Sequence, residues 1–330
     1  ALGASNIRVL LFNMKGMIDE KLLVQSIVKP IMDIRTAEVD KNKNSIDYIK
    51  KEVITSGEIQ EATKFDLITY ELLSGNTIIF VDGCKTSLII GTKGIKERNV
   101  EKPDTEQTIR GNKQSFVENI YTNIALLRNM IKSPDLTVDF LKVGKRSKTN
   151  IGVIYLRGVI NEDLPQSIIK SLGEINIDGI VDSSQIQALI QKHKWTIFTQ
   201  MVATERVDRI TSAILEGRAG IIVEGSPFVL IVPTTFGLFL NTPDDYYGRF
   251  IVTSLLRIIR YAGFFGACST SALYLALTTY HPGMIPTPLA LSIAGTRVGL
   301  PFPVTLEIVI MELALYLIQE AALRLPKVVG

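Results

Sequence analysis

Three carboxylates interrupt an apolar segment near the end of the 330-residue chain: Glu307, Glu312 and Glu320 lie in GLPFPVTLEIVIMELALYLIQEAALRLPK (299–327). A carboxylate in a membrane helix is costly, and it usually faces a helix bundle, a partner or water. At 100° per residue, Glu307 and Glu312 are about 140° apart, so one polar stripe does not hold both. We expect Glu312, the deepest, to face other helices or an aqueous path, with Glu307 nearer the outer interface.

The same carboxylates have a second interpretation, in which they are packing acids bonded to a neighbouring helix, and the sequence favours neither. Glu320 and Arg324 are four residues apart, which places them on one helix face as a candidate ion pair near the end of the segment.

The elements that would position these acids form a predicted membrane region at 241–330. Residues 261–280 (YAGFFGACSTSALYLALTTY) carry no charge over 20 positions, the length of a spanning helix. The preceding 249–260 mixes arginines with bulky apolar residues, as an interfacial helix does. We predict an irregular, Pro-rich stretch at 281–303 and a second apolar helix at 304–325. The alternative is a buried helix of a soluble domain.

Basic residues flank both ends of this pair of helices, and we interpret four of them as membrane-interface anchors: Arg249, Arg257, Arg260 and Lys327. Only Arg297 lies between the two helices. The positive-inside rule then predicts a multi-pass protein with residues 1–247 in the cytoplasm. Basic and acidic residues balance across 1–247, which argues against a nucleic-acid binder.

An internal repeat organises the rest of the chain. Residues 64–83 (KFDLITYELLSGNTIIFVDG) align without gaps on 206–225 (RVDRITSAILEGRAGIIVEG), with eight of twenty positions identical. At the same offset of 142 residues, 11–23 aligns on 153–165. Strand-like runs alternate with helical ones in each copy, which predicts an α/β (α+β) fold built of two repeated modules. We expect a first module at 1–92, a connector at 93–150 with a helix at 114–132, and a second module at 151–240.

Small and acidic residues at equivalent positions mark the turns of the repeat: Gly16, Gly158, Asp82, Gly83, Glu224 and Gly225. Asp82 and Glu224 are candidate acids, but a short polar residue followed by glycine is typical of a structural turn, which we favour.

Motifs for phosphate, dinucleotide, metal and nucleophilic-serine sites are absent from the sequence. The two cysteines are far apart, which fits a reducing compartment. We therefore expect no enzyme activity, no catalytic residue, no metal site and no cofactor.

Six blocks carry a family resemblance: RGNKQSFVENIYTNIALLRNMIKSPDL (110–136), GKRSKTNIGVIYLRGV (144–159), ATERVDRITSAILEGRAGIIVEGSPFVLIVPTTF (203–236), PDDYYGRF (243–250), YLALTTYHPGMIPTPLALSIAGTRVGLPFP (274–303) and EIVIMELALYLIQEAALRLPK (307–327). In this order they resemble the A subunits of GerA-family spore germination receptors. Asn112-Lys113 departs from the family pattern. Family members continue into further membrane helices, so we expect the chain to be an excerpt.

The resemblance implies a subunit of the spore inner membrane that acts with a transporter-like B subunit and a lipoprotein C subunit. It further implies a homo-oligomer that contacts membrane lipid and forms an ion channel, so that a nutrient triggers ion release. The alternative is a membrane-tethered, two-lobed sensor module that binds a small ligand. The nutrient, the oligomer number and the gate do not follow from the sequence.

Overall fold

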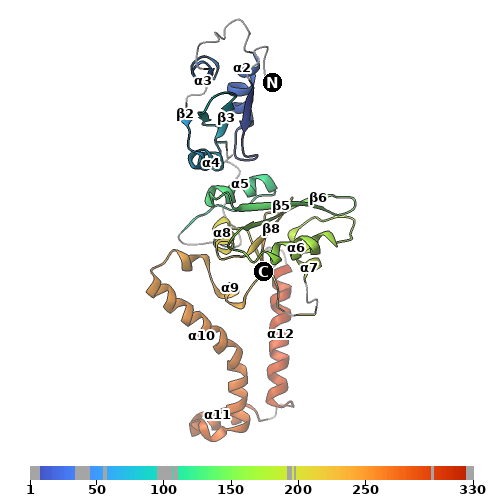
Figure 1. Ribbon diagram of the computed structural model, residues 1–330. Helices are drawn as coiled ribbons and strands as arrows, with labels where there is room; N and C mark the ends of the chain where they lie inside the picture. Colours follow the sequence, from blue (N-terminus) through green and yellow to red (C-terminus); the bar gives the residue numbers. More distant parts are fainter. Residues whose placement is uncertain are drawn as a thin grey trace. The chain divides into compact units, whose positions relative to one another are not determined.

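Two antiparallel sheets with helices on both faces make up the first of the two units into which the chain divides, 1–247 and 248–330 (Figure 1). The computed structural model describes residues 8–33, 45–54, 58–94, 106, 111–191, 195–196, 198–298 and 301–324. The expected mixed α/β fold is confirmed for the first unit.

The first sheet has the strand order β1 (Val9–Phe12), β3 (Thr77–Val81), β4 (Ser87–Ile90) and β2 (Ile59–Ala62). Successive side chains of a strand face opposite sides, so each side of the sheet can carry its own core. One side packs against two helical stretches: α1 (Glu20–Leu23) to α2 (Lys29–Met32), and α3 (Ser45–Tyr48) with the π-helical turn Ile49–Val53. On the other side, Ile78 and Ile89 pack against Ile68 of α4 (Phe65–Leu73).

The second sheet has five strands in the order β5 (Leu136–Val143), β6 (Thr149–Leu156), β8 (Ala219–Val223), β9 (Val229–Val232) and β7 (Val202–Thr204). Helices α6 (Asp163–Gly173) and α7 (Ser183–Ile190) cover one face, where Leu172 and Ile186 meet Ile151 and Ile221. Helices α5 (Ile120–Met130) and α8 (Val207–Leu215) cover the other. The short α9 (Phe236–Leu240) and a 3₁₀ turn at Pro243–Tyr246 end the unit.

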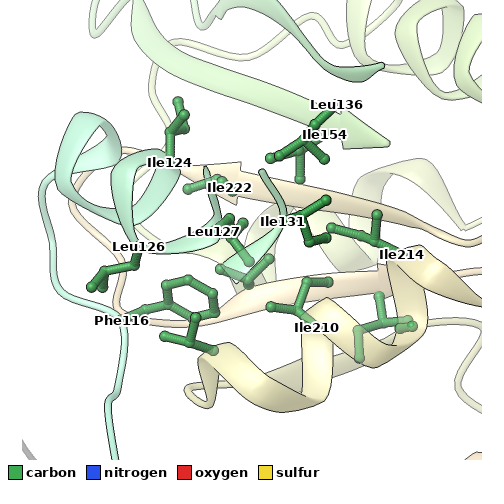
Figure 2. Close-up of a cluster of buried hydrophobic side chains, with 14 of the residues drawn as sticks. Phe116, Ile124, Leu126, Leu127, Ile131, Leu136, Ile154, Ile210, Ile214 and Ile222 are labelled. Atoms are coloured by element: carbon green, nitrogen blue, oxygen red, sulfur yellow. The ribbon is translucent and has the colours of Figure 1, made fainter. Parts of the chain in front are cut away.

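The core between α5, α8 and the second sheet is drawn in Figure 2. Ile124, Leu127 and Ile131 point from α5 and its end toward Ile154 and Ile222 of the strands. Ile210 and Ile214 complete the cluster from α8. These side chains recur three or four residues apart, the spacing that gives a helix one apolar face.

The two sheets repeat each other at the offset found in the sequence. Strands β3 and β8 begin at Thr77 and Ala219, 142 residues apart, and α4 and α8 are offset by the same amount. The register also repeats, since Val9 pairs with Val81 and Ile151 pairs with Val223. Among the described residues, the second sheet alone has an additional strand, β5, which lies outside β6.

The connector helix differs from its prediction. It runs from Ile120 to Met130 rather than over 114–132, because the Asn119 side chain accepts hydrogen bonds from the backbone N–H groups of Tyr121 and Thr122 and so caps the helix. The residues ahead of the cap are not helical, and Ser115 forms a β-bridge with Arg206.

The second unit corrects two further predictions. One helix, α10 (Phe250–Leu275), continues as a π-helical turn to Tyr280 and replaces the separate segments expected at 249–260 and 261–280. The predicted irregular stretch at 281–303 contains α11 (Thr287–Thr296). Helix α12 spans Val304–Arg324. Among the described residues, one helix, Phe250–Tyr280, is long and apolar enough to cross a membrane.

Candidate functional site

Glu312 meets a polar partner on another helix of the second unit. Ser271 of α10 donates a hydrogen bond from Oγ to Glu312 Oε1 of α12 at 2.8 Å. Glu312 is the ninth of the 21 residues of α12, so the contact falls near the middle of that helix. A hydroxyl that donates to a carboxylate oxygen fixes the direction of the carboxylate.

A second polar contact lies one turn along the same face of α10. Arg297, which follows α11, donates from Nη2 to the Tyr274 hydroxyl at 2.9 Å, and its guanidinium carbon lies 5.8 Å from the centre of the Tyr274 ring. Ser271 and Tyr274 are three residues apart, so α10 presents both polar groups on one side. A carboxylate and a guanidinium are thus both held by α10.

For the other residues of the predicted membrane region, the structure gives their positions in the helices. Glu307 lies in the first turn of α12, and its N–H donates to Pro303 O at 3.2 Å. Arg249 is the N-cap residue of α10, whose first half carries Arg257 and Arg260. The Arg324 side chain and Lys327 lie outside the described residues, so the proposed pair of Glu320 with Arg324 stays a prediction.

The turn residues of the repeat occupy turns in the structure. Gly83 and Gly225 have φ of +80° and +87°, and Gly16 and Gly158 have +88° and +77°, a region that favours glycine. The N–H of Asp82 donates to Arg8 O and that of Glu224 to Asn150 O, and the Asn150 amide also donates to the Glu224 carboxylate. These contacts fit the structural interpretation of both acids.

A buried ionic cluster at the start of α8 was missed by the sequence analysis. Arg206 is 0% exposed, and Asp208 accepts from its Nε at 3.0 Å and from its Nη2 at 2.6 Å. The other guanidinium donors reach the backbone carbonyls of Glu106 and Asn112, each at 3.0 Å. Four of its five N–H groups thus have a named acceptor, and a buried guanidinium needs such acceptors because an unpaired one would be very costly.

Residues of the connector enter this cluster with side chains as well. The Glu106 carboxylate pairs with Arg209 and accepts from Thr204 Oγ1 at 2.6 Å, while its N–H donates to Glu205 Oε1 at 3.0 Å. Arg209 also donates to Leu238 O at 3.1 Å. The cluster therefore joins the connector to the N-terminus of α8.

Tyr247, the last residue of the first unit, reaches the same carboxylate. Its hydroxyl donates to Asp208 Oδ2 at 2.7 Å, and the Asn112 N–H lies 3.5 Å from the Tyr247 oxygen. Burial raises the pKa of Tyr247, and the hydrogen bond to Asp208 raises it further, so this hydroxyl stays a donor. A Cβ on Gly111 would lie 2.4 Å from the Tyr247 ring, so only glycine fits there.

The equivalent positions of the first module lack this burial. Lys64 and Asp66 stand where the second module has Arg206 and Asp208, and both are exposed at the start of α4. The signal was present in the sequence as a local divergence of the repeat, KFDL against RVDR. The fold of the module does not itself require the cluster.

No metal site accompanies these groups in the described part of the chain, where no three or more His, Cys, Asp or Glu residues gather as ligands.

Comparison with known proteins places this architecture in a family. The model of the Bacillus/Clostridium GerA spore germination proteins matches residues 2–330. Spore germination protein KA of Bacillus subtilis (strain 168) is 37% identical over 315 residues, which are 96% of this chain and 57% of that protein. An uncharacterized membrane protein of the same organism, YfkQ, is 31% identical over 316 residues, 96% of this chain and 61% of that protein. The chain thus spans about three-fifths of these relatives' lengths.

A solved structure is similar as well. The crystal structure of the N-terminal domain of the A subunit of the Bacillus megaterium spore germinant receptor GerK3 has a TM-score of 0.53 and 28% sequence identity, and the match covers 70% of this chain and 84% of that one. From the family match over nearly every residue and from these relatives, the chain belongs to the GerA family of spore germination proteins.

Proposed function

We propose that the chain is the A subunit of a nutrient-responsive germination receptor of the spore inner membrane, acting with B and C subunits. Support comes from its family membership and from its similarity to the N-terminal domain of a GerK3 A subunit. The proposal contains no catalytic step. The proposed activity is instead the release of ions through a homo-oligomer of this subunit.

The second unit supplies the membrane part of the proposal. Residues Phe250–Tyr280 form 31 helical residues, about 46 Å at 1.5 Å per residue, which exceeds a hydrocarbon core of about 30 Å. Helix α12 would return through the bilayer. The arginines in the first half of α10 would then lie at the cytoplasmic surface, with residues 1–247 on that side.

Glu312 carries the ion-path part of the proposal. A charged group at the centre of a membrane helix costs about 2.5–3.5 kcal/mol on insertion scales, so it is retained where it has a role. The Ser271 hydroxyl, at 2.8 Å, holds this carboxylate between two helices. A fixed carboxylate in this position would attract cations into an aqueous path.

Spores offer the direct test. Glu312→Gln removes the charge and keeps the size, whereas Glu312→Asp keeps the charge. We expect the Gln variant to release cations at least about tenfold more slowly on addition of nutrient, and the Asp variant to retain most of the release. Normal release by the Gln variant, at equal protein level, would exclude the ion-path role. Normal release after deletion of the gene, in a strain without paralogues, would exclude the receptor role.

The two-lobed sensor is the second candidate, and the shared topology of the two modules favours it. Two similar lobes joined by a connector could close on a small molecule. If the full chain shows no thermal shift with any nutrient or nucleotide, the sensor function is excluded and the channel function is unaffected.

A further inference from the structure

The cluster around Asp208 joins three segments that are far apart in the sequence. Asp208 belongs to the start of α8, Glu106 and Asn112 belong to the connector that leads out of the first module, and Tyr247 stands three residues before α10 along the chain. We propose that Asp208, Arg206 and Tyr247 form a coupling cluster, which transmits the position of the connector to the start of α10.

The carboxylate of Asp208 binds both Arg206, on the connector side of the proposed link, and Tyr247, on the α10 side. Asp208 Oδ2 accepts from Arg206 Nη2 at 2.6 Å and from the Tyr247 hydroxyl at 2.7 Å. The same Nη2 donates to Asn112 O at 3.0 Å, so three hydrogen bonds in series connect the connector backbone to the Tyr247 side chain by way of Arg206 and Asp208. Displacing Asn112 would therefore disturb the bond that orients Tyr247.

The connector is also bound to α8 through its backbone. The Phe116 N–H donates to Glu205 O at 2.8 Å, and the Val207 N–H donates to Gln114 O at 3.4 Å. These two backbone bonds hold the connector to Glu205 and Val207, the residues on either side of Arg206. Loosening of the cluster can therefore be measured at the backbone amides of residues 111–117.

Stability of the module alone does not explain the cluster. A buried ion pair adds little net stability compared with apolar packing, and the first module folds with Lys64 and Asp66 exposed at the equivalent positions. What the second module has in addition is the connector on one side and the chain to α10 on the other. The link to germination rests on the function proposed above, whereas the link between connector and Tyr247 does not.

The test uses Tyr247→Phe, which removes one hydroxyl and keeps the ring against Gly111. The matched control is Tyr155→Phe. Tyr155 also donates to an aspartate, Asp139, at 2.9 Å, but Tyr155 lies on β6 and Asp139 on β5, and neither belongs to the cluster around Asp208. Asp208→Asn is avoided as the main variant, because it would leave the buried Arg206 without its counter-charge.

Hydrogen exchange of the purified full chain is the first readout. We expect Tyr247→Phe to speed exchange of the 111–117 amides about tenfold, the effect of losing one hydrogen bond to a charged group. We expect Tyr155→Phe to leave those amides unchanged. Unchanged exchange in Tyr247→Phe, or equal acceleration in both variants, would overturn the coupling cluster.

Nutrient-triggered cation release from spores is the second readout. We expect Tyr247→Phe to slow release or to raise the nutrient concentration required several-fold, and Tyr155→Phe to behave as the wild type. Faster exchange with normal release would overturn transmission to α10. If deletion of the gene does not impair release, the proposed function fails, and the exchange result still decides whether the connector and Tyr247 are linked.

Discussion

Ser271 Oγ lies 2.8 Å from Glu312 Oε1, so a helix of 31 residues and the helix that follows α11 share a hydrogen bond between a hydroxyl and a carboxylate. The contact fixes which side of α12 faces α10. It also gives the carboxylate a donor that water would otherwise supply.

Ser271→Ala should weaken the function of Glu312 without removing its charge. A lost hydrogen bond to a charged group corresponds to about a tenfold effect, so we expect cation release to slow by up to that factor. Ser271→Thr keeps the hydroxyl and should restore most of the rate. Release from spores at matched protein level is the measurement, and equal rates for Ala and Thr would contradict a role for the hydroxyl.

Gly220→Ala should destabilise the second module. A Cβ at this position of β8 would lie 2.9 Å from Ile154 Cγ2 and 2.9 Å from Ile210 Cδ1, so these two buried side chains would have to shift. Overpacking of this kind costs about 2 kcal/mol, which lowers Tm by roughly 4–8 °C. Gly173→Ala is the control, because nothing lies within 4 Å of its Cβ. Thermal unfolding of the full chain tests both, and equal Tm values would refute the close packing.

Two turn glycines of the second module should differ in their tolerance of alanine. Gly158 and Gly217 both have positive φ, +77° and +86°, and alanine costs about 1 kcal/mol in that region. Only at Gly217 would the Cβ also meet a backbone atom, the Val159 carbonyl oxygen at 2.9 Å. Gly217→Ala should therefore lower the free energy of unfolding clearly more than Gly158→Ala in denaturant titrations. Equal losses, or a larger loss for Gly158→Ala, would contradict the effect assigned to the Val159 contact.

Asp182 should make stability depend on pH at the acid end. Burial alone would raise its pKa, but hydrogen bonds from the Ser184 and Ser226 hydroxyls and from backbone N–H groups outweigh this and lower the pKa from 3.8 to about 2. Because the folded pKa lies below the unfolded one, the stabilisation is present above about pH 4 and is lost as the pH falls toward 2.

Asp182→Asn removes this dependence. We expect the variant to be less stable than the wild type at pH 6, by at most about 1 kcal/mol because the group is partly exposed, and the difference to narrow below about pH 4. Unfolding of the full chain at several pH values measures it. Asp178→Asn, at an exposed pair with Arg146 of 3.9 Å, is the control. A difference that stays constant down to pH 2 would count against the role of the charge.

The sequence predicted what depends on local pattern. Repeated turn glycines and apolar runs gave the 142-residue offset, and β3, β8, α4 and α8 follow it. The spacing of apolar residues gave a wrong start for helix α5, because a single capping residue decides where that helix begins. Phe116 shares the apolar stripe of Ile120 and Ile124, yet Asn119 caps the helix after it, and the Phe116 N–H is bonded to Glu205 O instead.

The Arg206 cluster could not be predicted, because its partners are distant in the chain. Glu106 and Asn112 lie 100 and 94 residues away from Arg206, and the divergence of the repeat at RVDR marks the position of Arg206 without indicating these partners. In α10, the change of composition after Arg260 suggested a boundary. Backbone hydrogen bonding continues through it because no proline interrupts the helix before Pro282.

Strand β5 makes the second module different from the first in folding kinetics. Each module has one short-loop hairpin, β3–β4 joined by 82–86 and β8–β9 joined by 224–228. Strands β5 and β6 give the second module another, joined by residues 144–148, whereas β1 of the first module pairs with β3, whose partner residues lie about 70 positions away. Closing the short loop loses little chain entropy, so the hairpin can form before any long-range contact. We expect the second module, although it is synthesised later, to be the one that nucleates.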